Sequence, residues 1–104
     1  MRPPARQKKV NIVVSPRLEK EVIIQNQNGL HVRPAALFVK LASKHHVDLW
    51  VERDGERVNG KSIMGLMMLA ACKGTKLKLL AEGADSEKAI SEIQELIESR
   101  FGEE

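Results

Sequence analysis

The chain has 104 residues and a formal net charge of +3, a length that fits one domain with one modest core and no second catalytic lobe. Five of the 17 basic residues lie within residues 1–18, which contain no acid, so the remaining 12 face 14 acidic residues. The chain has no Tyr, two Phe and one Trp, which leaves few rings on which bases could stack. We therefore expect no nucleic-acid role for the domain.

The same composition indicates the compartment and the domain boundaries. The single cysteine, Cys72, excludes an intramolecular disulfide and fits a reducing compartment, where we expect a small buried thiol. No apolar run approaches a membrane span, and residues 1–18 lack the apolar core of a signal peptide. We expect a cytoplasmic protein without membrane insertion. Residues 1–18 are expected to form a basic N-terminal extension, either flexible or adding a short strand at residues 10–14, before a domain at residues 19–104.

Hydrophobic periodicity predicts the first elements of the domain in chain order. Residues 22–24 are β-branched and predict a strand, and a helix is expected from about Arg33 to Lys44. Apolar residues at 47, 49 and 51 alternate with polar ones, which predicts a strand with one buried face. The Asp54-Gly55 pair then predicts a hairpin turn whose return strand occupies residues 56–59.

The second half of the chain predicts a short helix over residues 62–71 and a strand over residues 77–81. A last helix is expected after Asp85, with an apolar repeat that continues to Phe101. The order β-α-β-β-α-β-α predicts an α+β protein, with three helices on one face of a four-stranded antiparallel sheet. Trp50 should then lie on the uncovered face of that sheet.

The most informative stretch, residues 28–36, places His31 on a loop where a helix begins. Gly29 permits a tight backbone, and Pro34 suits an early helical position. A first helical turn leaves N–H groups free and carries partial positive charge, so it can hold an anion. Arg33 adds a guanidinium that can grip phosphate oxygens, and a nucleophilic imidazole beside such a site suits a transient phosphohistidine. The alternative is a surface histidine that caps the helix.

Three further features suggest chemistry but have simpler explanations. Residues 55–62 match the P-loop pattern G-x-x-x-x-G-K-[ST], which requires a loop wrapped around phosphates. Because Asp54-Gly55 predicts a hairpin and residues 56–59 a strand, we do not expect nucleotide hydrolysis. Ser62 by itself predicts a helix N-cap. The adjacent His45 and His46 cannot readily chelate one metal together, and we expect no metal site.

Residues 28–36, followed by Val-Asn-Gly-Lys-Ser-Ile-Met-Gly-Leu-Met at residues 58–67, resemble the histidine-containing phosphocarrier family, HPr, of the bacterial sugar phosphotransferase system. The similarity runs from about Glu19 to Phe101, with both segments at the family's spacing. It implies an open-faced β-sandwich that takes a phosphoryl group from enzyme I and passes it to enzyme IIA domains of sugar permeases. We expect a monomeric carrier without a cofactor, one that is covalently phosphorylated and is not a stand-alone turnover enzyme.

Carried over residue by residue, the resemblance implies that His31 accepts the phosphoryl group and that Arg33 is its charge partner. The backbone N–H groups of Val32 and Arg33 are expected to bind the phosphate. Ser62 matches a regulatory serine modified by the HPr kinase/phosphorylase. Part of the adjacent apolar surface is implied to dock partners, namely Ile63, Met64 and Met67. The alternative function is a regulatory binding protein controlled by phosphorylation of Ser62, with little or no role in sugar uptake.

Overall fold

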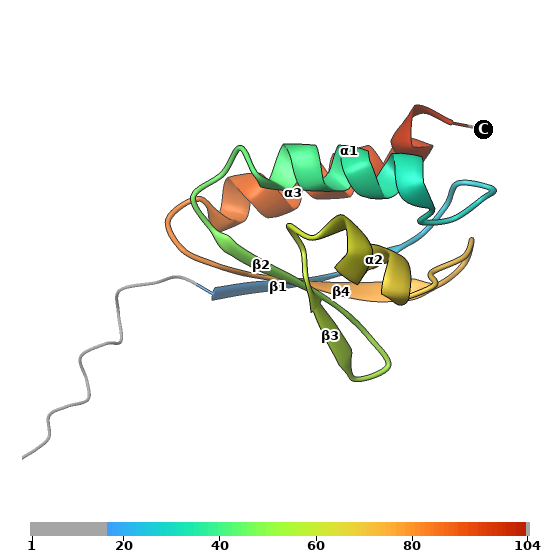
Figure 1. Ribbon diagram of the computed structural model, residues 1–104. Helices are drawn as coiled ribbons and strands as arrows, with labels where there is room; N and C mark the ends of the chain where they lie inside the picture. Colours follow the sequence, from blue (N-terminus) through green and yellow to red (C-terminus); the bar gives the residue numbers. More distant parts are fainter. Residues whose placement is uncertain (1–16, 104) are drawn as a thin grey trace, which may run out of the picture.

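The structure is a computed structural model, and it describes residues 17–103 (Figure 1). The expected N-terminal extension lies outside the described residues except for Arg17 and Leu18, which begin the first strand. The elements are β1 (Arg17–Ile23), α1 (Val32–Ala42), β2 (Asp48–Arg53), β3 (Glu56–Asn59), α2 (Ile63–Met68), β4 (Lys76–Glu82), α3 (Ser86–Glu98) and the 3-10 turn η3 (Arg100–Gly102).

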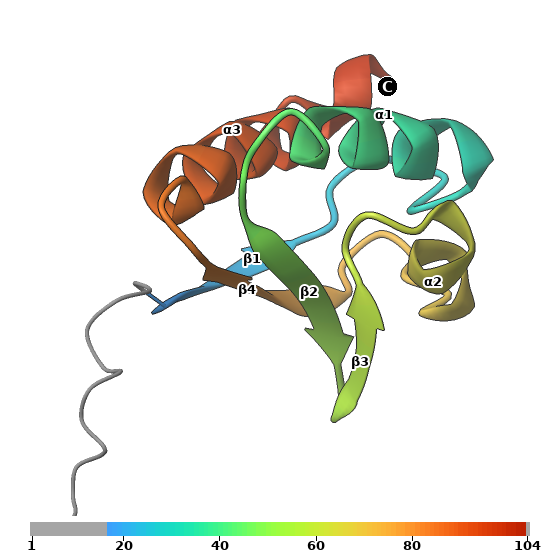
Figure 2. The same ribbon diagram turned by 60° about the vertical axis from the view of Figure 1, so that its left-hand side comes forward.

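The four strands form one antiparallel sheet in the order β1-β4-β2-β3. Helices α1 and α3 lie side by side over one face of this sheet, and α2 packs beside α1 and β3 (Figures 1 and 2). The predicted order of elements and the open-faced α+β architecture are thus confirmed. Within residues 17–103, no helix has the length and apolar character needed to cross a membrane.

The core lies between the sheet and the helices, as expected from the alternating pattern of the strands and the helical spacing of the apolar residues. In β2, Leu49 and Val51 are buried, while the residues between and beside them are more exposed. Phe38 of α1 and Ile93 of α3 meet them from the helical layer, each at most 1% exposed. Burial of one such side chain contributes roughly 1.5–3 kcal/mol to stability. The core therefore holds α1, which begins directly after His31, and α3 firmly on the sheet.

Trp50 lies on the sheet face opposite to the helices, as predicted, because its neighbours Leu49 and Val51 both point into the core. Its cross-strand partners are Leu80 on β4 and Asn59 on β3. Trp50 is half-buried, and Leu80 beside it is only 2% exposed. This face therefore carries a small apolar contact of its own, separate from the main core.

Several element boundaries differ from the predicted ones. Strand β1 begins at Arg17 instead of Val22, and α1 ends at Ala42 instead of Lys44. Helices α2 and α3 also end early.

The helix expected over residues 62–71 ends at Met68, because Ala70 takes a left-handed conformation with φ of +50°. The last helix ends at Glu98, and Phe101 lies in η3 with φ of +54°. The prediction that the helix continues to Phe101 was wrong, since the chain turns sharply after α3 and buries the Phe101 ring in the core.

The P-loop pattern at residues 55–62 does not form a phosphate loop. Gly55 has φ of +87° and lies in the hairpin turn between β2 and β3, and residues 56–59 pair with β2. The last residue of the pattern, Ser62, precedes a helix of only six residues. The backbone of residues 56–59 is thus paired in the sheet and does not wrap around a phosphate.

Candidate functional site

The loop between β1 and α1 is held against the segment that follows α2. The N–H of Leu30 donates to the carbonyl oxygen of Ala71 at 2.8 Å. Gly29 has φ of +71°, and a Cβ there would lie 2.5 Å from that same oxygen. Only glycine meets both demands, since it has no Cβ and adopts positive φ at little cost. The position of His31, two residues further on, follows from this close approach.

His31 is the N-cap of α1, but its imidazole does not act as the cap. The residue has an extended backbone, and its carbonyl oxygen accepts the first helical hydrogen bond from the N–H of Ala35 at 2.9 Å. The side chain makes no capping hydrogen bond and is 41% exposed. The alternative of a surface histidine that caps the helix is thus met by the backbone of His31, while its imidazole makes no capping bond and stays available for other contacts.

Helix α1 begins directly beside this imidazole. Val32 and Arg33 are its first two residues and are exposed, and the buried Pro34 follows as a third residue without an N–H. The first N–H groups of a helix have no intrahelical acceptor and carry the positive end of the helix dipole. Two N–H donors and one exposed guanidinium therefore lie close to His31 in the chain, an arrangement suited to a phosphate.

Glu103, which no sequence pattern singled out, contacts His31 from the C-terminal segment. Its Oε2 and Oε1 lie 3.2 and 3.4 Å from Nε2 of His31. The fully buried Asn26 donates from Nδ2 to Oε1 of Glu103 at 3.0 Å and to the carbonyl oxygen of Gly29 at 2.8 Å. Asn26 thereby ties the carboxylate to the same loop that presents the imidazole.

The Glu103 side chain is only 14% exposed, yet its carboxyl group favours the ionised form. Its burial acts to raise the pKa. Hydrogen bonds from Asn26 and His31, together with the positive charges of His31 and Arg33, outweigh this effect and lower the pKa of Glu103 below its ordinary value. A fixed negative charge is thus held at the edge of the imidazole.

This lowered pKa predicts an acid-dependent loss of stability. The ionised contact stabilises the fold fully above the ordinary Glu value of 4.5, and the contribution is lost as the pH falls below 4.5 through the folded pKa. We expect the difference in unfolding free energy between wild type and Glu103→Gln to shrink in that range, as measured by urea denaturation at several pH values. Glu95→Gln, at an exposed position of α3, is the control and should show no such trend. A wild-type advantage that grows on acidification below pH 4.5 would contradict the prediction.

Ser62 is the N-cap of α2, as its sequence position predicted. Its Oγ accepts a hydrogen bond from the N–H of Gly65 at 3.0 Å, and the residue is half-buried. The hydroxyl therefore supports the start of the helix in the unmodified protein, where replacement of such a cap by Ala costs about 1 kcal/mol.

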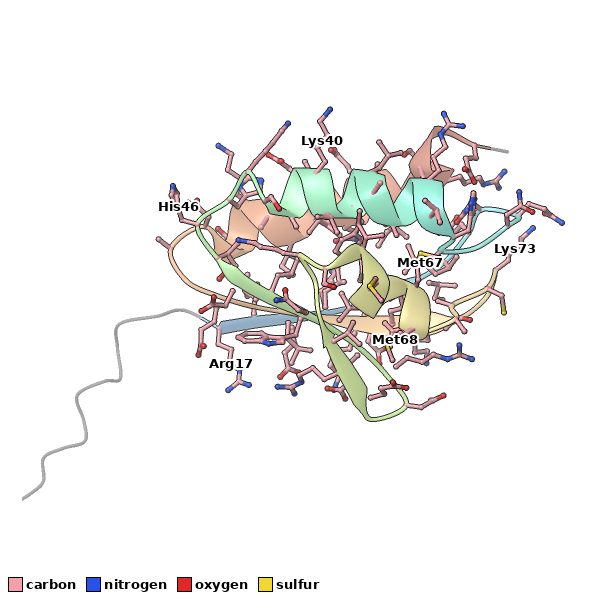
Figure 3. The ribbon with its side chains drawn as sticks, in the orientation of Figure 1. Arg17, Lys40, His46, Met67, Met68 and Lys73 are labelled. Carbon is pink, nitrogen blue, oxygen red and sulfur yellow. The ribbon has the colours of Figure 1, made fainter. Side chains whose placement is uncertain are left out.

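Helix α2 carries a group of exposed apolar side chains, which we call the α2 patch: Ile63, Met64, Met67 and Met68. Met64 and Met68 are 75% and 67% exposed, and Val32 at the start of α1 is 57% exposed. Figure 3 shows Met67 and Met68 on α2, which packs beside α1. Flexible methionine side chains in such numbers suit a surface that meets several partners.

The remaining candidates have structural explanations. No group of three or more His, Cys, Asp or Glu side chains suited to a metal occurs in the described part of the chain. His45 is buried and its Nε2 lies 2.9 Å from Oε1 of Glu92 on α3. The expectation that Cys72 is buried was wrong: it is exposed on the turn before β4, with its N–H bonded to the hydroxyl of Thr75.

Comparison with known proteins decides what this arrangement belongs to. The family model described as "PTS HPr component phosphorylation site" matches residues 18–99. Phosphocarrier protein HPr of Borreliella burgdorferi is 50% identical over 82 residues, which is 79% of this chain and 95% of that protein. The chain belongs to the HPr family.

The relatives of this chain include phosphocarrier proteins and an HPr-like protein. The HPr-like protein Crh of Bacillus subtilis is 43% identical over 76 residues, 73% of this chain and 89% of Crh. A crystal structure of HPr from Thermoanaerobacter tengcongensis matches with a TM-score of 0.81 and 54% identity, covering 84% of this chain and 98% of that one. The predicted resemblance is confirmed, and with it a general role as a phosphocarrier of the phosphotransferase system.

Proposed function

We propose that this protein accepts a phosphoryl group on His31 from enzyme I and passes it to enzyme IIA domains of sugar permeases. The observation that carries the proposal is the exposed imidazole at the start of α1, held through Nε2 by an ionised carboxylate. A nucleophile in this position is accessible to a partner and already oriented, so the partner supplies the donor and this chain supplies the acceptor.

The contact of Nε2 with Glu103 assigns the roles of the two ring nitrogens. With Nε2–H donating to Glu103, the lone pair of the neutral ring lies on Nδ1. In the proposed step, Nδ1 attacks phosphorus and the bond from phosphorus to the donor atom of enzyme I breaks. The ring gains positive charge as the new bond forms, and the carboxylate of Glu103 stabilises that charge.

The start of α1 stabilises the phosphoryl oxygens during transfer. The N–H groups of Val32 and Arg33 and the guanidinium of Arg33 supply donors where negative charge gathers. Phosphoryl transfer depends mostly on positioning and charge stabilisation, which a helix start and one guanidinium can provide. Arg33 is exposed and can move away from the phosphoryl group, so it does not hinder transfer of that group to the next protein.

Arg33→Lys tests the guanidinium, since it keeps the charge and loses the two-pronged donor. We expect transfer from enzyme I to slow by about tenfold or more, because one hydrogen bond to a charged group is worth about 1.5–3 kcal/mol. Folding should be unaffected at this exposed position. Lys40→Gln, which removes a charge elsewhere on α1, is the control. Equal rates for Arg33→Lys and wild type would show that Arg33 is only a solvated helix residue.

The proposed function is tested by incubating the protein with phosphoenolpyruvate and enzyme I and measuring its intact mass. We expect the gain of one phosphoryl group, labile in acid and stable in base, because protonation of the leaving nitrogen speeds hydrolysis of a phosphoramidate. An HPr of known activity treated in parallel controls for the enzyme. No mass gain in this protein while that control is phosphorylated would overturn the proposal.

The finer partner assignments rest on the α2 patch and on Ser62. We propose that Ile63, Met64 and Met67 dock enzyme I and the IIA domains, and that the HPr kinase/phosphorylase modifies Ser62. The exposure of the methionines and the cap position of Ser62 support both assignments. We further propose a cytoplasmic monomer. HPr of Thermoanaerobacter tengcongensis has also been crystallised as a dimer, so sedimentation of this protein at increasing concentration is the direct check.

A solution structure of Crh, 41% identical to this chain, is described as the Bacillus subtilis catabolite repression HPr. That similarity favours one second candidate, a regulatory protein whose output is binding controlled by Ser62. The two functions differ in the fate of the phosphoryl group on His31. A carrier loses it to an added IIA domain, whereas a purely regulatory protein retains it or never acquires it. The presence of His31 with Arg33 and Glu103 around it supports the carrier.

A further inference from the structure

Arg53, at the end of β2, contacts the chain just beyond α2. Its Nη1 donates to the carbonyl oxygen of Leu69 at 2.7 Å and to that of Ala70 at 2.9 Å. Helix α2 ends at Met68, and the last carbonyl groups of a helix have no intrahelical donor. One guanidinium nitrogen therefore satisfies two acceptors at this end and joins the segment after α2 to the sheet.

The same segment has a backbone that needs support. Ala70 has φ of +50°, a left-handed conformation that a residue with a Cβ rarely adopts. Such a conformation persists where surrounding contacts hold it. The bond from Arg53 to the carbonyl oxygen of Ala70 is one such contact, and the bond from the N–H of Ala70 to the carbonyl oxygen of Met67 at 3.0 Å is another.

The residue that follows, Ala71, supports the loop of His31. Its carbonyl oxygen accepts a hydrogen bond from the N–H of Leu30 at 2.8 Å. The same oxygen lies where a side chain on residue 29 would be, a space that Gly29 leaves free. A continuous run of bonded backbone thus leads from Arg53 through Ala70 and Ala71 to Leu30, the residue before His31. Loss of the guanidinium frees the first of these links while leaving the core untouched.

We propose that Arg53 is a positioning residue for phosphoryl transfer. It fixes the carbonyl groups of Leu69 and Ala70, directly before Ala71, whose carbonyl oxygen holds the loop of His31. This inference rests on the proposed function of His31. It gives Arg53 no contact with the phosphoryl group. Its effect is on the orientation of the imidazole at the moment of attack, where a displacement of about 1 Å can cost 100-fold in rate.

Amide hydrogen exchange of the Arg53→Gln protein tests the structural half of the proposal. We expect the N–H of Leu30 to lose protection by about tenfold, while the N–H of Leu79 in the central strand β4 stays within about twofold of wild type. The control is Arg57→Gln, an exposed arginine on β3 that pairs only with Glu52 among the described residues, and it should change neither amide. Arg53→Lys retains one charged donor nitrogen but loses the planar guanidinium, and it should give an intermediate loss at Leu30.

The rate of phosphorylation by enzyme I tests the functional half. We expect Arg53→Gln to slow transfer by about tenfold at saturating concentrations of the protein, with little change in KM, because the defect lies in orientation and not in docking. Unchanged exchange at Leu30, or equal loss of protection at Leu30 and Leu79, overturns the proposal. So does a change in KM alone, which would place the role of Arg53 in docking through α2.

Failure of this inference is distinguishable from failure of the proposed function. If the wild-type protein takes no phosphoryl group, the proposed function fails and the positioning role fails with it, whatever the exchange data show. If wild type is phosphorylated and Arg53→Gln matches its rate, only the role of Arg53 is overturned. Should Arg53→Gln fail to fold, Arg53→Lys decides by the same two measurements.

Discussion

His31→Ala is expected to abolish phosphorylation by phosphoenolpyruvate and enzyme I completely, since the side chain that attacks phosphorus is gone. The intact mass of the variant should stay unchanged under conditions that convert wild type. The fold should remain, because the imidazole is 41% exposed and is not the cap of α1. Circular dichroism and a cooperative urea transition check that second expectation.

A matched histidine variant makes this result specific. His46 is exposed and follows the C-terminal end of α1, so His46→Ala removes an imidazole without touching the site. It should be phosphorylated like wild type. Undiminished labelling of His31→Ala, or loss of labelling in both variants, would contradict the assignment of His31.

Ser62→Asp is expected to reduce phosphorylation of His31 by enzyme I by at least about tenfold. The new carboxylate lies directly before the α2 patch, where docking would strip it of water beside apolar side chains and set it against an acidic partner. The fold should survive, because Asp is a good N-cap and a helix start accommodates an anion. The measurement is the rate of enzyme-I-dependent transfer at low and at high salt.

Ser62→Asn separates charge from shape, since it also caps the helix but carries no charge. We expect its transfer rate to stay near that of wild type, and we expect added salt to restore part of the rate of Ser62→Asp. Equal rates for Ser62→Asp and wild type at both salt concentrations would reduce Ser62 to a simple helix cap. A defect that salt does not lessen would indicate damage to packing.

Local pattern predicted most of the fold because the decisive signals lie within a few residues of each other. The alternation at Leu49, Trp50 and Val51 predicted both the strand and its buried face, and the structure agrees. Residues 28–36 likewise predicted a loop, a glycine turn and a helix start around His31. The known family then supplied the chemistry that local pattern left open.

The contacts that local pattern missed join residues far apart in the chain. Glu103 lies 72 residues from His31, and it reaches the imidazole only because the chain turns after α3 with Phe101 in a left-handed conformation. The support from Arg53 depends in the same way on Ala70, whose positive φ no propensity rule predicts for an alanine. Both conformations are chosen by tertiary packing, so a periodicity argument extended the helices through them.

The position of Trp50 has a practical consequence for experiments on this protein. It is the only tryptophan and the chain contains no tyrosine, so ultraviolet emission comes from one indole on the sheet face away from the helices. That indole is half-buried beside Leu80 and will change its emission when the sheet comes apart. His31 and the α2 patch belong to the helical side of the sheet, so we expect the emission of Trp50 to change little when a partner binds there. We therefore expect Trp50 fluorescence to report unfolding of the sheet, and the urea transitions proposed above can be followed by it.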